Sequence, residues 1–222
     1  MSKILVIAPH ADDEVLGCGG SILKQVSKGN EVFVCVVTKG CPPLFSQENS
    51  EQIRQESIQC QARLGVTKYF YLDFPAVMLE NVPRHELNGA LLKVMEEVQP
   101  DQVFIPHAGD MQKDHQLVAE ACMVALRPKY DWQVRCILSY ETLSETGWNT
   151  PTPQNEFIPT VYEDISAYLD GKLAALSCYA SQLSDFPQAR SLEAVKVLAQ
   201  YRGAMMGLRA AEAFMLIRDI RK

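Results

Sequence analysis

Residues 10–14, His-Ala-Asp-Asp-Glu, place one imidazole and three carboxylates within five positions. The segment that leads into them, KILVIAPH at 3–10, has the composition of a short buried strand, and the glycine cluster GCGG follows at 17–20. A polar turn that caps the next helix would use Asp12 or Asp13, but not every charge in the group. Imidazole and carboxylate side chains together suit a divalent cation such as Zn²⁺, so the segment predicts a metal site.

A dinucleotide-binding turn is another interpretation of a glycine-rich segment after a strand. Its G-x-G-x-x-G pattern would need a glycine at position 22, where the chain has Ile22. The next strand segment carries Thr38 and Lys39 near its end, where that fold has an acidic residue that binds the ribose. Both differences favour the metal site.

A catalytic zinc usually takes three protein ligands and leaves a fourth position open. His10 and Asp13 supply two ligands, so a third has to come from elsewhere in the chain. Of the four histidines, His85 opens a polar helix, where we expect it to be solvated. His107 and His115 flank the segment HAGDMQKDH, and from the residues alone either one can be the third ligand.

Short apolar segments alternate with amphipathic segments along the first half of the chain. This alternation predicts an α/β fold that is Rossmann-like, with a mostly parallel sheet and helices on both faces. The carboxyl ends of parallel strands share one edge of the sheet, where the two His- and Asp-containing segments would meet. The predicted strands are 3–10, 31–40, 68–74 and 101–107, and the predicted helices are 14–30, 49–65, 84–99 and 114–128.

The helix at 49–65 has Asn49 or Ser50 as its expected cap and Gly65 as its terminator. Residues 144–162 contain several prolines and little periodicity. We expect an ordered loop at the active site there rather than a linker, so residues 1–222 are predicted to form a single domain. The remaining predicted elements are strand 133–143, helices 166–182 and 191–207, and a last strand at 211–220.

Composition narrows the class of protein. Hydrophobic residues make up 47% of the chain, which is ample for a sizeable core, and the formal net charge is −6. The acidic balance argues against nucleic acid or an anionic membrane as the main partner, although a local basic pocket for a phosphate is compatible with it. No segment approaches the roughly 18 apolar residues of a membrane span.

The seven cysteines are odd in number and include no C-x-x-C pair, as expected of reduced thiols. With no signal-peptide pattern at the start, we expect a cytoplasmic protein. Its oligomeric state is left open, a homo-oligomer included.

The two motifs, PHADDE and DMQKDH, resemble those of the LmbE-like or PIG-L-like zinc-dependent N-deacetylases. The usual signatures of that family are A-H-P-D-D-E near the N-terminus and H-P-D-H about a hundred residues later. Segments from SYETL to AEAF also resemble a branch often associated with bacterial surface-sugar pathways. The resemblance implies His10, Asp13 and His115 as metal ligands and Asp12 as the general base that takes a proton from the attacking water.

Position 112 departs from the family pattern. The resemblance implies a histidine there that polarises the carbonyl and stabilises the oxyanion, whereas this chain has Gln112. An amide donates a hydrogen bond to an oxyanion but does not carry a proton. Either Gln112 performs the electrostatic part alone, or another group, with His107 as a candidate, takes the acid role.

Several other residues are candidates for supporting roles. Asp110 and Asp114 are expected either to orient the ligand imidazoles through hydrogen bonds, which adds Asp114 to the catalytic set, or simply to cap a helix. Glu14 is expected to complement the positive N-terminus of its helix. For substrate contacts, Arg54 is a candidate for a sugar or phosphate group and Trp148 for stacking on a sugar face, the alternatives being a solvated charge and simple packing.

Together with the metal site, the resemblance implies a hydrolase that uses Zn²⁺, or another divalent cation, to remove an acetyl group from an N-acetylated amino sugar or its conjugate. A thiol-linked glycoside is the second substrate class. The non-enzymatic alternative is a sugar- or nucleotide-binding module whose metal site has decayed.

Overall fold

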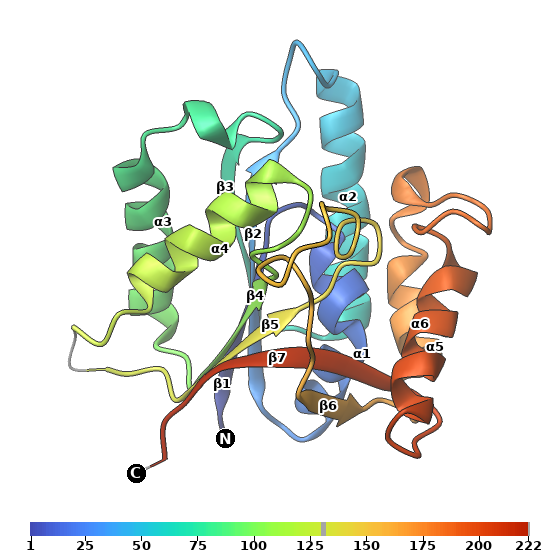
Figure 1. Ribbon diagram of the computed structural model, residues 1–222. Helices are drawn as coiled ribbons and strands as arrows, with labels where there is room; N and C mark the ends of the chain where they lie inside the picture. Colours follow the sequence, from blue (N-terminus) through green and yellow to red (C-terminus); the bar gives the residue numbers. More distant parts are fainter. Residues whose placement is uncertain (130–131, 222) are drawn as a thin grey trace.

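A seven-stranded sheet crosses the centre of the computed structural model (Figure 1). The structure describes residues 1–129 and 132–221. The strands lie in the order β3-β2-β1-β4-β5-β7-β6; the first five are parallel, and β7 and β6 are antiparallel to their neighbours. The predicted Rossmann-like α/β fold is therefore confirmed. The strands are β1 (Lys3–Ala8), β2 (Glu31–Lys39), β3 (Lys68–Pro75), β4 (Gln102–Pro106), β5 (Cys136–Tyr140), β6 (Val161–Asp164) and β7 (Ala211–Asp219).

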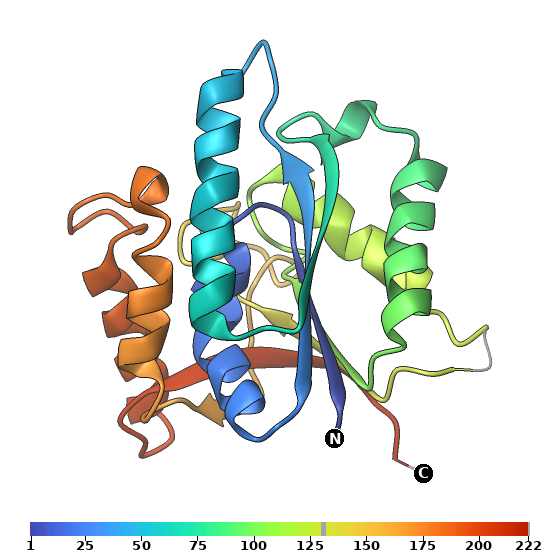
Figure 2. The same cartoon turned by 180° about the vertical axis from the view of Figure 1, so that it is seen from behind.

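Helices cover both faces of this sheet, as Figures 1 and 2 show from opposite sides. One layer holds α1, α2, α5 and α6, and the other holds α3 and α4. Across the described ranges, no helix has both the length and the apolar character needed to span a membrane. The helices are α1 (Asp13–Ser27), α2 (Gln47–Leu64), α3 (Arg84–Val98), α4 (Lys113–Ala125), α5 (Leu169–Leu176) and α6 (Leu192–Ala204), with short 3₁₀ turns η1 (Leu79–Asn81) and η2 (Ala180–Gln182).

Strand β1 shows why the sequence folds this way. Its side chains alternate between the two layers: Val6 packs in the core below α1 and α2, and Leu5 and Ile7 pack against α3 and α4. A strand buried on both faces has to be apolar where it is buried, as this one is from Ile4 to Ala8. After this buried stretch, polar side chains appear again only beyond the end of the strand, at His10.

Some element boundaries differ from the predictions. Ser46, not Asn49 or Ser50, caps α2, because its side chain accepts the backbone N–H of Asn49 at 3.1 Å. Gly65 ends the helix in the left-handed conformation, as predicted.

Two further differences lie in the second half. Residues 144–162 end in an edge strand, β6, whose few residues show too little alternation to be recognised in the sequence. The helix predicted at 166–182 stops at Leu176, and only a 3₁₀ turn follows at Ala180–Gln182.

Helix α1 packs unusually close to its neighbours. A Cβ at Gly17 would overlap the ring of Tyr140, and one at Gly20 would lie 2.8 Å from Ile165. Glycine therefore lets the helix approach β5 and the segment before α5. Because Asp12 and Asp13 stand at the start of α1, this packing also sets the position of their carboxylates.

We expect Gly17→Ala to lower the free energy of unfolding by about 1–3 kcal/mol, since the added methyl overpacks a buried contact. Gly89→Ala on α3 is the matched control, because a Cβ there meets nothing within 4 Å. That change should raise stability by about 0.5–1 kcal/mol. Urea denaturation of both variants measures the difference; equal effects would contradict the close packing of α1.

Candidate metal centre

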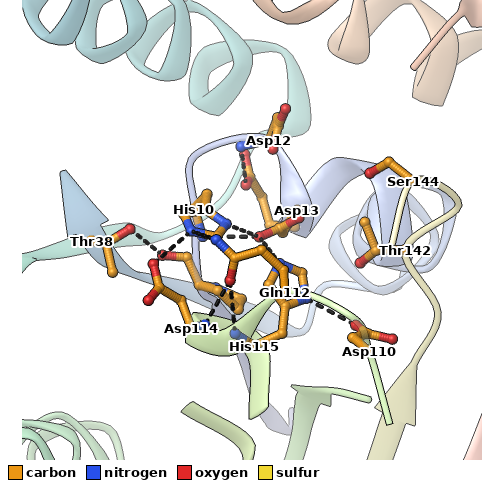
Figure 3. A network of polar contacts seen from close by, with 12 residues as sticks. His10, Asp12, Asp13, Thr38, Asp110, Gln112, Asp114, His115, Thr142 and Ser144 are labelled. Carbon is orange, nitrogen blue, oxygen red and sulfur yellow. Dashed lines mark hydrogen bonds and ion pairs between the residues drawn. The ribbon is translucent and has the colours of Figure 1, made fainter. Parts of the chain in front are cut away.

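The two polar segments meet at the carboxyl edge of the sheet, between β1 and β4 (Figure 3). The connection after β1 leads through α1 to β2 on one side, and the connection after β4 leads through α4 to β5 on the other. In open α/β sheets this reversal of strand order opens a crevice, which is where ligands bind. Residues from the two distant motifs are therefore brought to one place by the topology alone.

His10, Asp13 and His115 form the centre of this group. Each contributes one possible ligand atom, and these atoms all lie within 4.8 Å of one another. The Oδ2 atom of Asp13 lies 3.3 Å from Nδ1 of His10 and 3.2 Å from Nε2 of His115. Asp13 and His115 are fully buried, and the His10 side chain keeps 20% of its surface exposed. The structure thus brings together the three residues that the resemblance implied as ligands.

Two aspartates contact the outer nitrogens of these imidazoles. Nε2 of His10 lies 3.1 Å from Oδ2 of Asp114, and Nδ1 of His115 lies 2.9 Å from Oδ2 of Asp110. Asp114 is held in turn by the backbone N–H of Val77. Such contacts fix the ring orientation and leave the opposite nitrogen free of hydrogen, as a metal ligand requires. Both expected hydrogen bonds are present, and neither aspartate acts as the helix cap.

The cluster has the chemistry of a cation site. Nε2 of His115 and Oδ1 of Asp13 are buried and have no hydrogen-bond partner in the part of the chain that the structure describes. Burial alone would lower the pKa of His115, but Asp13 and Asp110 raise it to about 10. Burial alone would raise the pKa of Asp13, but His115 and His10 hold it well below its usual value. The pocket around Asp13 therefore favours positive charge, which a divalent cation can supply.

Asp12 has a strained backbone and a buried side chain. Its φ of 114° is rare for any residue with a side chain, and it occupies the N-cap position of α1 without a capping hydrogen bond from its side chain. One carboxylate oxygen, Oδ2, accepts a 2.6 Å hydrogen bond from Arg190, and the other has no partner among the described residues. Burial raises the pKa of Asp12 to about 8, and the guanidinium of Arg190 opposes the rise.

Glu14 holds this strained turn in place. Its Oε2 accepts the backbone N–H of Asp12 at 3.0 Å, and its Oε1 accepts the hydroxyls of Tyr179 at 2.6 Å and Tyr69 at 3.2 Å. Burial raises the pKa of Glu14 to about 7, and the Tyr179 hydrogen bond opposes the rise. The residue lies at the N-terminus of α1 as expected, but fully buried contacts rather than an exposed helix end determine its environment.

Gln112 is the N-cap of α4. Its side-chain oxygen accepts the backbone N–H groups of Asp114 at 2.6 Å and His115 at 3.3 Å. Its amide nitrogen lies 3.2 Å from Nε2 of His10. Because that His10 nitrogen donates to Asp114 when Nδ1 is free of hydrogen, the Gln112 amide hydrogens are available to another acceptor.

A cavity of about 210 Å³ opens next to the cluster. His10 and Gln112 line it together with the C-terminal end of β2, one side of α2 and residues from later segments, among them Glu145 and Arg190. Arg54 lies in this lining, where its guanidinium stacks 3.6 Å from the centre of the Tyr71 ring and pairs with Asp73. The cavity can hold one compact polar ligand beside the exposed edge of His10.

Two other candidates lie away from this cavity. Trp148 is 79% exposed and does not contribute to the lining. His107 is buried with its Nε2 3.0 Å from the carbonyl oxygen of Asn155 and its ring against the edge of Phe157. The structure therefore groups His115, and not His107, with His10 and Asp13.

Arg190 and Tyr179 were not identified in the sequence as site residues. Both follow the long irregular region, and each lies more than 160 positions from its partner near the N-terminus. Arg190 stands directly before Ser191, the N-cap of α6, which gives an ordinary helix-start pattern. The spacing of residues along the chain therefore did not predict the contact of Arg190 with Asp12 or that of Tyr179 with Glu14.

The fold and the cluster together define an α/β protein with an enzyme-like polar site at the switch point of its sheet. A family model described as PIG-L, GlcNAc-PI de-N-acetylase, matches residues 5–126, which include both motifs. Since this is more than half of the chain, the protein belongs to the PIG-L family, as its motifs suggested.

Individual relatives agree with that assignment. The chain is 29% identical to the uncharacterized deacetylase YaiS of Escherichia coli (strain K12) over 80% of this chain and 90% of that protein. It is 26% identical to the diacetylchitobiose deacetylase of Thermococcus kodakarensis, over 99% and 85% of the two chains. The crystal structure of the conserved protein TT1542 from Thermus thermophilus matches with a TM-score of 0.80 and 26% identity, covering 100% of this chain and 97% of that chain.

We expect His115→Ala to abolish metal binding and Asp110→Asn to weaken it by roughly 10–100-fold, because Asp110 only orients the imidazole. His107→Ala is the matched control and should keep the metal, since that histidine lies outside the cluster. Metal analysis and titration of the purified variants measure these affinities. Loss of metal from His107→Ala, with the metal retained in His115→Ala, would show that His107 and not His115 is the third ligand.

Proposed function

We propose that the protein is a zinc-dependent hydrolase that removes the acetyl group from an N-acetylated amino sugar or its conjugate. The observation that carries the proposal is the His10–Asp13–His115 cluster, which lies beside a cavity with Asp12 next to it in the chain. Two imidazoles and one carboxylate form a ligand set typical of catalytic zinc. The relative from Thermococcus kodakarensis, named as a diacetylchitobiose deacetylase, supports an amino sugar as substrate.

His10, Asp13 and His115 would hold the zinc, which when bound makes water a stronger acid and polarises a carbonyl. Asp12 accepts the proton of the attacking water and passes it to the leaving amine. Its burial raises its pKa and so favours proton uptake, and Arg190 opposes this rise while its hydrogen bond orients the carboxylate. Asp110 and Asp114 hold the imidazoles still through the reaction.

Gln112 supplies the electrostatic part of the role that a histidine has in the family pattern. Its oxygen is fixed by the first turn of α4, so its amide group points in one direction and lines the cavity. A fixed donor stabilises an oxyanion without reorganising during the reaction. Because an amide does not transfer a proton, the transfer to the amine rests on Asp12.

Asp12→Asn should keep zinc but lower kcat by about 10²–10⁴-fold, since it removes the general base and not a ligand. Acetate release from a panel of N-acetyl amino sugars, with zinc content measured on the same samples, tests this. Equal loss of zinc in the variant would exclude Asp12 from the role of base. Sugar binding without acetate release by the zinc-loaded wild type would favour a non-catalytic binding module.

Tyr179→Phe should lower kcat by about tenfold with little change in KM, because the Glu14 carboxylate that holds the Asp12 backbone becomes mobile. Tyr140→Phe is the matched control: it removes an equally buried hydroxyl, which donates to the Ile7 carbonyl and not to Glu14. Steady-state kinetics at equal zinc content compare the two. The same loss of kcat in both variants would mean that Tyr179→Phe acts by destabilising the fold and not through Glu14.

A further inference from the structure

We propose that the substrate carries an anionic group, a phosphate or a carboxylate, next to its N-acetyl sugar, and that Lys39 binds this group. The inference rests on the proposed function, because it concerns the same cavity. It follows from the charges that line the cavity and from which of them already have a partner.

Positive charge dominates the cavity wall. Lys39, Arg54 and Arg190 all line it, and Glu145 is its acidic residue. This contrasts with the whole chain, whose formal net charge is −6. A cation of this wall that lacks a carboxylate partner would attract a ligand of opposite charge.

The two arginines already have carboxylate partners. Arg54 pairs with Asp73 and stacks on Tyr71, and Arg190 pairs with Asp12. Their charges are largely neutralised, and their geometry is set by these contacts. Lys39, in contrast, has no carboxylate within 4.0 Å of its ammonium among the described residues. Among the cations that line the cavity, Lys39 is therefore the one available to bind an anionic ligand.

The backbone at Lys39 is fixed close to the metal cluster. The residue before it, Thr38, donates from both its backbone N–H and its hydroxyl to the carbonyl oxygen of Pro9, which precedes His10. The carbonyl of Lys39 accepts the N–H of Ala76 at 3.0 Å. Lys39 therefore follows directly after the residue that binds the His10 loop, and it is half-buried rather than fully exposed.

This placement defines the order of groups along the substrate. The acetamide lies beside His10 and Gln112, and the anionic group lies at the C-terminal end of β2, where Lys39 is the last residue of the strand. A half-buried ammonium gains more from a charged ligand than an exposed one does, because screening by water is weaker there. A neutral N-acetyl sugar leaves that ammonium unmatched.

The test compares acetate release by the zinc-loaded protein from four probes. They are N-acetylglucosamine, its 1-phosphate, its 6-phosphate, and N-acetylmuramic acid, which carries a carboxylate. We expect kcat/KM for at least one anionic probe to exceed that for the neutral sugar by about tenfold, as one charge-assisted hydrogen bond supplies. The preferred probe identifies phosphate or carboxylate as the recognised group, and the preference should weaken with added salt.

Variants assign the effect to one residue. Lys39→Gln should reduce the ratio of anionic to neutral kcat/KM to about one, and Lys39→Arg should retain most of it. Lys196→Gln removes an exposed lysine from α6, outside the cavity, and should leave the ratio as it is in the wild type. An unchanged ratio in Lys39→Gln would overturn the proposal.

Binding without turnover separates this inference from the proposed function. The affinities of Asp12→Asn for the same four probes are measured by calorimetry. Tighter binding of anionic probes without acetate release by the wild type would contradict the proposed function and retain the anion site. Acetate release from all four probes with equal efficiency and equal affinity would overturn the anion site and leave the deacetylase.

Discussion

Three consecutive carboxylates, Asp12, Asp13 and Glu14, are buried at the end of β1, and the site depends on how each is compensated. A buried charge is costly unless it is paired or hydrogen-bonded. Each carboxylate has different partners. Asp12 pairs with Arg190, Asp13 lies against two imidazoles, and Glu14 accepts hydrogen bonds from two tyrosine hydroxyls and a backbone N–H. Different partners give neighbouring, chemically similar groups separate roles.

The same constraint links the site to the rest of the fold. Tyr179 follows α5 and Arg190 precedes α6, and both reach the N-terminal loop because α5 packs beside α1 and α6 packs against α5. The buried pair of Lys172 and Glu212 supports that arrangement, since the Lys172 ammonium donates to the Leu16 carbonyl of α1 at 2.8 Å. The C-terminal third of the chain therefore completes the site, although it lies beyond the segment that the family model matches.

The departure at position 112 illustrates how one side chain can combine structural and chemical roles. A histidine at an N-cap would have to accept the helix N–H groups through a ring nitrogen, whereas the amide of Gln112 uses its oxygen for this and keeps its donors free. The structure therefore retains a fixed donor toward the cavity without a titratable group there. In the proposed mechanism, proton transfer then rests on Asp12, whose backbone has a φ of 114°.

The sequence by itself determined the parallel α/β fold and the convergence of the two motifs. Strands buried on both faces are apolar throughout, and residues just after parallel strands share one edge of the sheet, so His10 and Asp13 could be expected to meet His107 or His115. The contacts of Asp110 and Asp114 with the imidazoles could be expected too, because both aspartates lie in the same short motif as His115. Edge strand β6 and the end of the helix at Leu176 were not predicted, because short, irregular segments carry little periodicity.

Only the tertiary structure decided which distant groups complete the site. It separated His115 from His107, placed Arg54 in the cavity and Trp148 outside it, and brought Arg190 and Tyr179 to residues 178 and 165 positions away. Local patterns encode which element a residue belongs to and which face it occupies. Contacts of this range depend on how whole helices pack against one another, and that packing has no counterpart in the spacing of residues along the chain.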